Sequence, residues 1–140
     1  MKRTVYLNGT FVGEDEAKLP IFDRGLLFAD AVYEGLGILD GQIIDFPRHM
    51  ARLRRSLGEL AIAEPMTQDQ FFAVLMELVG QNGLAEGFLY LHITRGTADR
   101  DYLYPEGLTP NIFAFTQPQT HQSADDEPKP VSMQSTPDLR

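Results

Sequence analysis

The segment Phe88–Thr94 places the strongest constraint on the fold, because its sequence, Phe-Leu-Tyr-Leu-His-Ile-Thr, alternates with a period of two. This alternation is typical of a β-strand whose two faces meet different surroundings. Gly96 ends the predicted strand, and a loop follows as far as Pro105. The chain is therefore expected to form a sheet that presents this loop at the end of one strand.

The loop after the strand combines guanidinium groups with phenolic hydroxyls, a combination that suits an anionic ligand. An arginine can donate two parallel hydrogen bonds to a carboxylate or a phosphate, and a tyrosine adds one more donor. The alternative is an ordinary surface loop whose arginines pair with neighbouring acids. The cations and phenols are Arg95, Arg100, Tyr102 and Tyr104, and the neighbouring acids are Asp99, Asp101 and Glu106.

Turn signals predict five further strands. Asn8-Gly9 and Asp40-Gly41 each separate two apolar segments, and such pairs are typical of tight hairpins because these residues tolerate a positive φ. The expected strands are Thr4–Leu7, Thr10–Val12, Ala31–Leu39, Gln42–Phe46 and Pro110–Gln117.

Two helices are predicted between the second hairpin and Phe88–Thr94. A capping acid, Asp45, followed by Pro47 predicts a helix over Pro47–Ala61. Thr67 and Gln70 have the spacing of a capping box before a helix over Asp69–Gly80. Helical spacing of apolar residues predicts the buried faces, which are Phe46, Met50, Leu53, Leu57 and Leu60 in the first helix and Phe72, Leu75, Met76 and Val79 in the second.

Together these elements predict an α+β fold, a mostly antiparallel sheet with two flanking helices. Residues 1–118 are expected to form one small domain, and residues 119–130, which are polar, acidic and proline-bearing, an interdomain linker. Residues 131–140 are expected to begin the first strand of a larger domain. Because this strand begins and then stops, the chain is expected to be a fragment or one product of a split polypeptide.

Composition excludes several classes of function. The chain has 140 residues, and its net charge of −8 argues against general binding of nucleic acids. Without cysteine it can form no disulfide, thiol nucleophile or thiolate metal site. No signal-peptide core, membrane-length apolar segment, metal-ligand spacing, P-loop, nucleophile elbow or dinucleotide fingerprint is present. We therefore expect a soluble, cytoplasmic protein.

The first predicted helix carries candidate binding residues. His49 and Arg52 are three residues apart, so one helical face presents both, and an arginine there suits a phosphate dianion. The alternative is a solvated basic face, formed with Arg48, Arg54 and Arg55, that pairs with Glu59 and other acids. An RNA contact is a weaker alternative, because neither interleaved aromatic residues nor a glycine motif accompanies these arginines.

Other polar residues are interpreted from their position in the predicted strands and turns. Glu34 lies in a strand that should be partly buried, so it needs a partner, whereas the adjacent Tyr33 fits the edge of a core. Asp23 and Arg24 are expected to form a local ion pair that fixes a turn. His92 alternates with Leu91 and Ile93 and is interpreted as structural on the opposite face, and the linker residue His121 carries no signal.

Four motifs resemble those of fold-type IV aminotransferases, which depend on pyridoxal phosphate. They follow the order and spacing of that family over Thr4–Thr116, and within it the pattern of D-amino-acid aminotransferases fits best. The motifs are Tyr6–Gly9, Asp23–Glu34, Phe46–Ser56 and Thr94–Arg100. The resemblance implies the small N-terminal domain of such an enzyme, which transfers an amino group between a D-amino acid and a 2-oxo acid.

The resemblance also implies roles for individual residues. Arg52 would bind the cofactor phosphate with His49 on the same helical face, and Tyr33, Arg100 and Tyr102 would bind the substrate α-carboxylate. D-amino-acid aminotransferases usually have histidine where this chain has Tyr102; a phenol can still donate a hydrogen bond but cannot carry the charge of an imidazolium. In these enzymes the loop with Arg100 reaches the site of a neighbouring subunit, so a homodimer is expected.

The family's Schiff-base lysine, the residue that carries out transamination, is expected to lie beyond Arg140, in a large C-terminal domain. The only lysines here are Lys2, Lys18 and Lys129, none in a place suited to that role. The 140-residue chain alone is therefore expected to be inactive. The alternatives are an aminodeoxychorismate-lyase-like or branched-chain aminotransferase activity, or a non-catalytic interaction domain.

Overall fold

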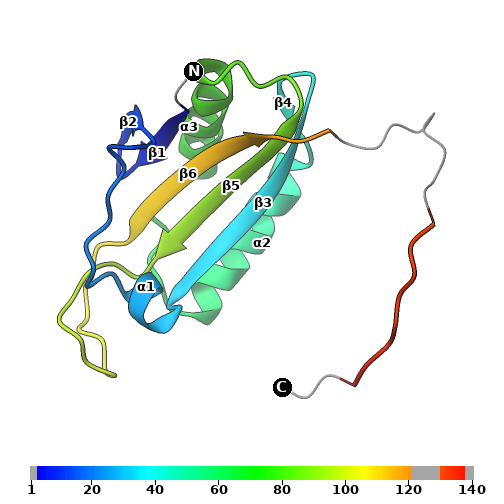
Figure 1. Ribbon diagram of the computed structural model, residues 1–140. Coiled ribbons are helices and arrows are strands. Elements are labelled where there is room, and N and C mark those ends of the chain that lie inside the picture. Colours follow the sequence, from blue (N-terminus) through cyan, green and yellow to red (C-terminus); the bar gives the residue numbers. More distant parts are fainter. Residues whose placement is uncertain (1–2, 121–129, 138–140) are drawn as a thin grey trace.

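The computed structural model describes residues 3–120 and 130–137, and most of them form a single antiparallel sheet with helices on one face (Figure 1). The sheet has six strands in the order β2-β1-β6-β5-β3-β4. Each neighbouring pair is antiparallel. The elements are β1 (Thr4–Leu7), β2 (Thr10–Gly13), α1 (Arg24–Phe28), β3 (Ala31–Leu39), β4 (Gln42–Ile43), α2 (Phe46–Glu59), α3 (Gln68–Gln81), β5 (Gly87–Thr94) and β6 (Asn111–Pro118).

This architecture confirms the predicted α+β fold. The predicted turn between β1 and β2 has positive φ at both central residues, 45° at Asn8 and 96° at Gly9. Strand β3 begins and ends at the predicted residues, and β5 begins one residue earlier than predicted. Because β5 pairs with both β3 and β6 along its whole length, the strand with the clearest alternation lies at the centre of the sheet.

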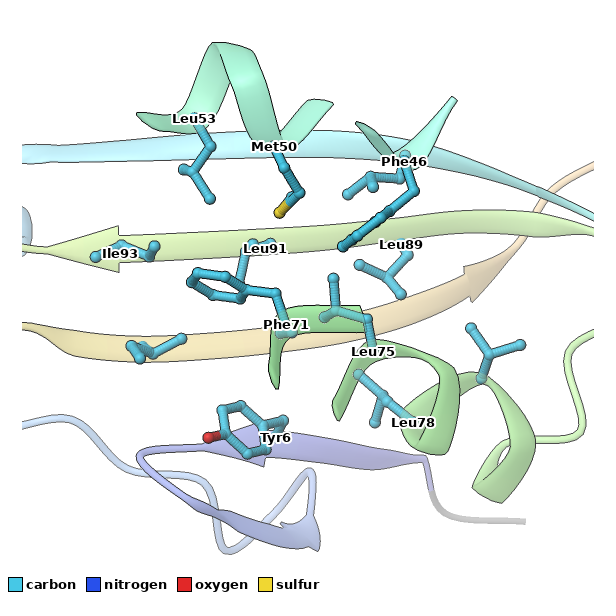
Figure 2. Packing of buried hydrophobic residues seen from close by; sticks show 14 of the residues in the cluster. Tyr6, Phe46, Met50, Leu53, Phe71, Leu75, Leu78, Leu89, Leu91 and Ile93 are labelled. Carbon is cyan, nitrogen blue, oxygen red and sulfur yellow. The ribbon is translucent and has the colours of Figure 1, made fainter. Parts of the chain in front are cut away.

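The hydrophobic core lies between the sheet and helices α2 and α3 (Figure 2). Leu89, Leu91 and Ile93 of β5 are almost completely buried and face the helices. Burial of each such side chain stabilises the fold by about 1.5–3 kcal/mol. The helices contribute Phe46, Met50, Leu53 and Leu57 from α2 and Phe71, Leu75, Leu78 and Val79 from α3.

The prediction for the buried face of α3 is partly wrong. Leu75 and Val79 are buried as expected, but Phe71 takes the inward position expected for Phe72, which is 45% exposed. Phe72 instead packs edge-on against Phe46 of α2, with ring centroids 5.1 Å apart. Apolar residues occupy adjacent positions at the start of α3, so the spacing fits two rotations of the helix, and packing against α2 selects one.

The ends of α2 also differ from the prediction. Asp45 occupies the N-cap position with a left-handed φ of 53°, and its side chain makes no capping hydrogen bond. Pro47 does lie in the first turn. The helix ends at Glu59, and Leu60 is 39% exposed rather than part of the core. The capping box predicted for Thr67 and Gln70 is confirmed.

The opposite face of the sheet carries a row of aromatic rings. Tyr90 of β5 stacks on Tyr33 of β3 at 5.5 Å and on Phe115 of β6 at 5.2 Å. His92 stacks on Phe113 at 4.8 Å and faces the Tyr90 hydroxyl at 2.9 Å. Burial lowers the pKa of His92 despite the opposing charge of Asp23. His92 therefore lies on the face opposite Leu91 and Ile93, as predicted, and its structural role stays a prediction.

The segment after β6 belongs to no helix or strand over the described residues 130–137. Most of the predicted linker, with His121 and Lys129, lies outside the described residues, as do Lys2 and residues 138–140. The domain boundaries and the additional strand therefore stay predictions. Within the described part of the chain, none of the helices is long and apolar enough to cross a membrane.

Candidate functional site

The first group of candidate residues is centred on Glu34. This glutamate is on the helix-facing side of β3 and is only 1% exposed. Its carboxylate accepts hydrogen bonds from Arg52 Nε at 2.9 Å and Arg52 Nη2 at 2.6 Å, and Oε2 lies 2.7 Å from His49 Nδ1. The partner that the sequence requires for Glu34 is therefore the pair His49 and Arg52, one helical turn apart on α2.

Glu34 and Arg52 each favour the ionised form of the other. Burial alone would raise the pKa of Glu34, but the hydrogen bonds from Arg52 and His49 outweigh it and hold that pKa below its ordinary value. Glu34 in turn raises the pKa of Arg52, mainly through the same hydrogen bonds. Since an ionised carboxylate can only accept, His49 Nδ1 must carry the proton of their shared hydrogen bond.

The geometry of Arg52 suits an anionic ligand. Glu34 fixes one edge of the guanidinium through Nε and Nη2, whereas the side chain as a whole is 56% exposed. The nitrogen Nη1 takes no part in the bonds to Glu34. An oriented guanidinium with an accessible edge, beside a half-buried imidazole, is a donor set that fits a phosphate.

The second group of candidate residues lies in the loop after β5. The Arg100 guanidinium is 5.4 Å from the ring centroid of Phe28 and 5.4 Å from that of Tyr102. The rings of Phe28 and Tyr102 are 6.1 Å apart. Tyr102 is 79% exposed. Arg100 and Tyr102 are thus brought together, next to α1, on the surface of the molecule.

Tyr33 makes neither a hydrogen bond nor a ring contact with either group in the described residues, although its phenol is a minor cause of the raised pKa of Arg52. It is 65% exposed and lies on the aromatic face of the sheet against Tyr90, the face opposite Glu34. In the described residues its ring contact is with Tyr90 rather than with Arg100 or Tyr102. The three side chains expected to bind one carboxylate therefore do not converge within this single chain.

The structure contains a buried ion cluster that the sequence did not predict, and this cluster changes the roles expected for Arg24 and Arg95. Arg24 pairs with Asp30 at 3.0 Å rather than with Asp23. Arg95 pairs with the same oxygen of Asp30 at 2.7 Å, so it belongs to the interior and not to the exposed part of the loop. The signal that could have identified the cluster is the clustering of charged residues in Asp23–Asp30, a short segment that must turn between two strands.

Asp23 has a different role from the one predicted. Its carboxylate caps α1 by accepting from the amide of Leu26 at 3.2 Å, and also accepts from Thr94 Oγ1 and from Asn111 Nδ2 at 2.7 Å. It therefore joins α1 to the ends of β5 and β6. The helix α1 itself was not predicted, because five residues are too few to show a helical period.

Comparisons with solved structures identify the fold. The fold resembles that of branched-chain amino acid aminotransferase from Escherichia coli, with a TM-score of 0.79, 19% identity, and coverage of 85% of this chain and 40% of that one. The 4-amino-4-deoxychorismate lyase of Pseudomonas aeruginosa is 28% identical, with a TM-score of 0.64, over 83% of this chain and 40% of its own.

Sequence similarity identifies the family. Residues 31–138 match the family model of class IV amino-transferases. The D-alanine aminotransferase of Bacillus licheniformis is 39% identical over 114 residues, which are 81% of this chain and 40% of that protein. This chain belongs to the class IV aminotransferase family. It spans about 40% of the length of the curated relatives that it matches.

Proposed function

We propose that this chain is the N-terminal part of a pyridoxal-phosphate-dependent aminotransferase that moves an amino group between a D-amino acid and a 2-oxo acid. The observation that carries the proposal is the exposed guanidinium of Arg52, which the buried Glu34 orients at 2.6 Å and 2.9 Å. The similarity to a D-alanine aminotransferase at 39% identity favours a D-amino acid as the donor.

In this proposal Arg52 and His49 hold the phosphate of the cofactor. When bound, pyridoxal phosphate supplies the electron sink that makes the bonds at the amino acid's Cα reactive. The accessible edge of Arg52 donates to the phosphate oxygens, and Glu34 prevents the side chain from adopting other rotamers. His49 lies 2.7 Å from the same carboxylate and adds a polar group on the same helical face.

The carboxylate of the substrate is assigned to Arg100, Tyr102 and Tyr33. Arg100 provides the charge, and the exposed hydroxyls provide neutral donors. Because Tyr33 lies apart from the other two, we propose that Arg100 and Tyr102 of one subunit complete the site of a second copy, in a homodimer. The lysine that binds the cofactor would lie in a C-terminal part, beyond residue 140.

A lyase that releases pyruvate is the second candidate, because the 4-amino-4-deoxychorismate lyase is 28% identical to this chain. Analysis of products separates the two reactions. An aminotransferase converts the amino acid to its 2-oxo acid over many turnovers only when a second oxo acid accepts the nitrogen. A lyase releases pyruvate without any acceptor.

The experiment that tests the two binding roles is a comparison of Arg100→Ala and Arg52→Ala in the complete enzyme. Arg100→Ala should raise KM for the amino acid about 10- to 100-fold, since a lost charge-assisted hydrogen bond costs about 1.5–3 kcal/mol. Arg52→Ala should weaken retention of the cofactor on dialysis and leave the choice among amino acids unchanged.

Arg55→Ala is the matched control, because Arg55 is an exposed arginine of the same helix that lies outside both groups. It should change neither quantity. If KM were unaltered by Arg100→Ala across a series of amino acids, the carboxylate role would be refuted. If Arg52→Ala bound the cofactor as tightly as the parent, the phosphate role would be refuted.

A further inference from the structure

Asp30 binds two buried arginines at the base of the loop that carries Arg100 and Tyr102. We propose that Asp30, Arg24 and Arg95 are positioning residues that fix this loop for substrate binding. The inference rests on the proposed function for the identity of the substrate, but the loop's attachment to the domain is argued from this chain alone.

The centre of the cluster is one carboxylate oxygen. Asp30 Oδ2 accepts from Arg95 Nε at 2.7 Å and from Arg24 Nε at 3.0 Å. The exposed fractions of these side chains are 13% for Asp30, 4% for Arg24 and 8% for Arg95. One negative charge therefore serves two buried positive charges, and main-chain carbonyl oxygens must stabilise the remaining positive charge.

Arg24 connects the cluster to the exposed part of the loop. Its Nη1 donates to the carbonyl oxygen of Asp101 at 2.8 Å, between Arg100 and Tyr102. The same guanidinium lies 4.6 Å from the ring centroid of Phe28, the ring that both Arg100 and Tyr102 contact. A single side chain thus holds the backbone between the two candidate residues and the ring on which they rest.

Arg95 connects the base of the loop to α2. Its two terminal nitrogens donate to the carbonyl oxygens of Leu60 at 2.7 Å and Ala61 at 3.1 Å. These carbonyls follow the C-terminal end of α2, where a cation is favoured. The guanidinium also lies 3.7 Å from the ring centroid of Tyr104, which covers it from the loop side.

These contacts attach the loop that carries Arg100 and Tyr102 to the helix that carries His49 and Arg52. Helix α2 carries Arg52 in its middle and accepts Arg95 just beyond its end, so the loop with Arg100 is fixed relative to the body of its own chain, from which it would present Arg100 to the site of the second copy. Within the described part of the chain, the side chains of Arg100 and Tyr102 contact each other and the ring of Phe28. Their position therefore depends on how firmly the loop backbone is held.

A test needs variants that loosen the loop without leaving two buried charges unpaired, as Asp30→Asn would. Tyr104→Leu removes the ring over Arg95 and keeps every ion pair. Arg24→Lys keeps the charge but replaces the fork, so one ammonium cannot make the same directed contacts with Asp30 and Asp101. Tyr104→Phe is the matched control, because it retains the ring.

The experiment measures two quantities in the complete enzyme: hydrogen exchange of the loop amides that donate hydrogen bonds, those of Ala98 and Leu103, and KM for the amino acid. We expect Tyr104→Leu and Arg24→Lys to accelerate loop exchange about tenfold or more, and to raise KM between about threefold and a hundredfold, since a displacement of 1 Å suffices for such losses. Affinity for the cofactor should stay unchanged, and Tyr104→Phe should behave as the parent in all measurements.

Unchanged loop exchange in both Tyr104→Leu and Arg24→Lys would overturn the proposal, as would a Tyr104→Phe variant that matches Tyr104→Leu. A raised KM in Arg100→Ala with an unchanged KM in the two loosened variants would also overturn it, because the loop's position would then not matter for binding. If exchange accelerates while KM is unchanged in Arg100→Ala as well, the loop attachment is supported and the proposed carboxylate role fails.

Discussion

Asp30 and Glu34 lie four residues apart, with Glu34 fully buried and Asp30 partly buried, and each accepts hydrogen bonds from two basic side chains. At both, burial alone would raise the pKa of the carboxyl, but the hydrogen bonds outweigh it: those from Arg95 and Arg24 at Asp30, and those from Arg52 and His49 at Glu34. Both pKa values therefore lie below their ordinary values, and both carboxylates are ionised at neutral pH. A negative charge is kept in the interior because two side chains donate hydrogen bonds to it: both come from α2 at Glu34, whereas one comes from α1 and one from the residue after β5 at Asp30.

Glu34→Gln should destabilise the chain at pH 7 by about 2 kcal/mol, since it replaces charge-assisted hydrogen bonds at a buried site. Because the pKa of Glu34 is lowered in the folded state, its contribution is complete above the ordinary value of 4.5 and is lost as the pH falls through the lowered pKa. The difference in unfolding free energy between parent and variant should therefore shrink between pH 7 and pH 3, measured by urea denaturation.

Glu64→Gln is the control for this measurement. Glu64 also pairs with an α2 arginine, Arg54 at 3.2 Å, but their side chains are 38% and 55% exposed. Its removal should change stability little at either pH. A Glu34→Gln variant with the same stability as the parent at pH 7, or with a difference that grows in acid, would contradict the assignment.

At the scale of elements, the buried faces of strands were predicted better than those of helices, although the strand predicted over Gln42–Phe46 ends at Ile43 and Phe46 begins α2. A strand has only two faces, and a shift of one residue exchanges them. The apolar residues Leu89, Leu91 and Ile93 therefore determine which face of the strand is buried. In α3 two adjacent apolar residues, Phe71 and Phe72, allow two helix rotations, and only contacts with α2 select between them. The three-residue spacing of His49 and Arg52 predicted a shared face, but their common partner Glu34 required the register of β3 against α2.

The backbone conformation at Gly96, two residues after the end of β5, predicts the effect of a substitution there. Gly96 has a φ of 118°, and a Cβ added there would collide with the carbonyl oxygen of Thr109. Gly96→Ala should therefore lower the unfolding free energy by about 2–3 kcal/mol, and it should lower the melting temperature measured by circular dichroism. Unaltered thermal stability would mean that the backbone at the base of the Arg100 loop can relax freely.

At Gly58 the same substitution, glycine to alanine, is expected to raise stability rather than lower it. It lies in the last turn of α2, and an added Cβ would meet no atom within 4 Å. Gly58→Ala should raise stability by up to about 1 kcal/mol, because alanine loses less backbone entropy in a helix than glycine. A fall in stability at Gly58 would show that the comparison with Gly96 does not isolate backbone strain.

At the scale of the whole molecule, the chain holds its candidate residues in two separate places. The Glu34 group joins β3 to α2 on the helix-covered face, whereas Arg100 and Tyr102 contact Phe28 of α1. The loop between β5 and β6 lies beyond the end of the sheet, close to α1 (Figure 1). Tyr33 belongs to the face without α2 and α3. Within the described residues these candidate side chains do not form one continuous group, and the chain spans about 40% of the length of the curated relatives that it matches.

This arrangement predicts how the chain reacts with pyridoxal phosphate followed by borohydride reduction. In the described residues the one lysine is Lys18, which is exposed between β2 and α1. An exposed amine lacks the desolvated surroundings that activate lysines for covalent catalysis. Intact-mass measurement of the 140-residue chain should therefore find scattered, unsaturable labelling. The complete enzyme should give one adduct per subunit, on a lysine beyond residue 140. A single saturable adduct on the 140-residue chain would contradict this division of roles and place the reactive amine among Lys2, Lys18 and Lys129.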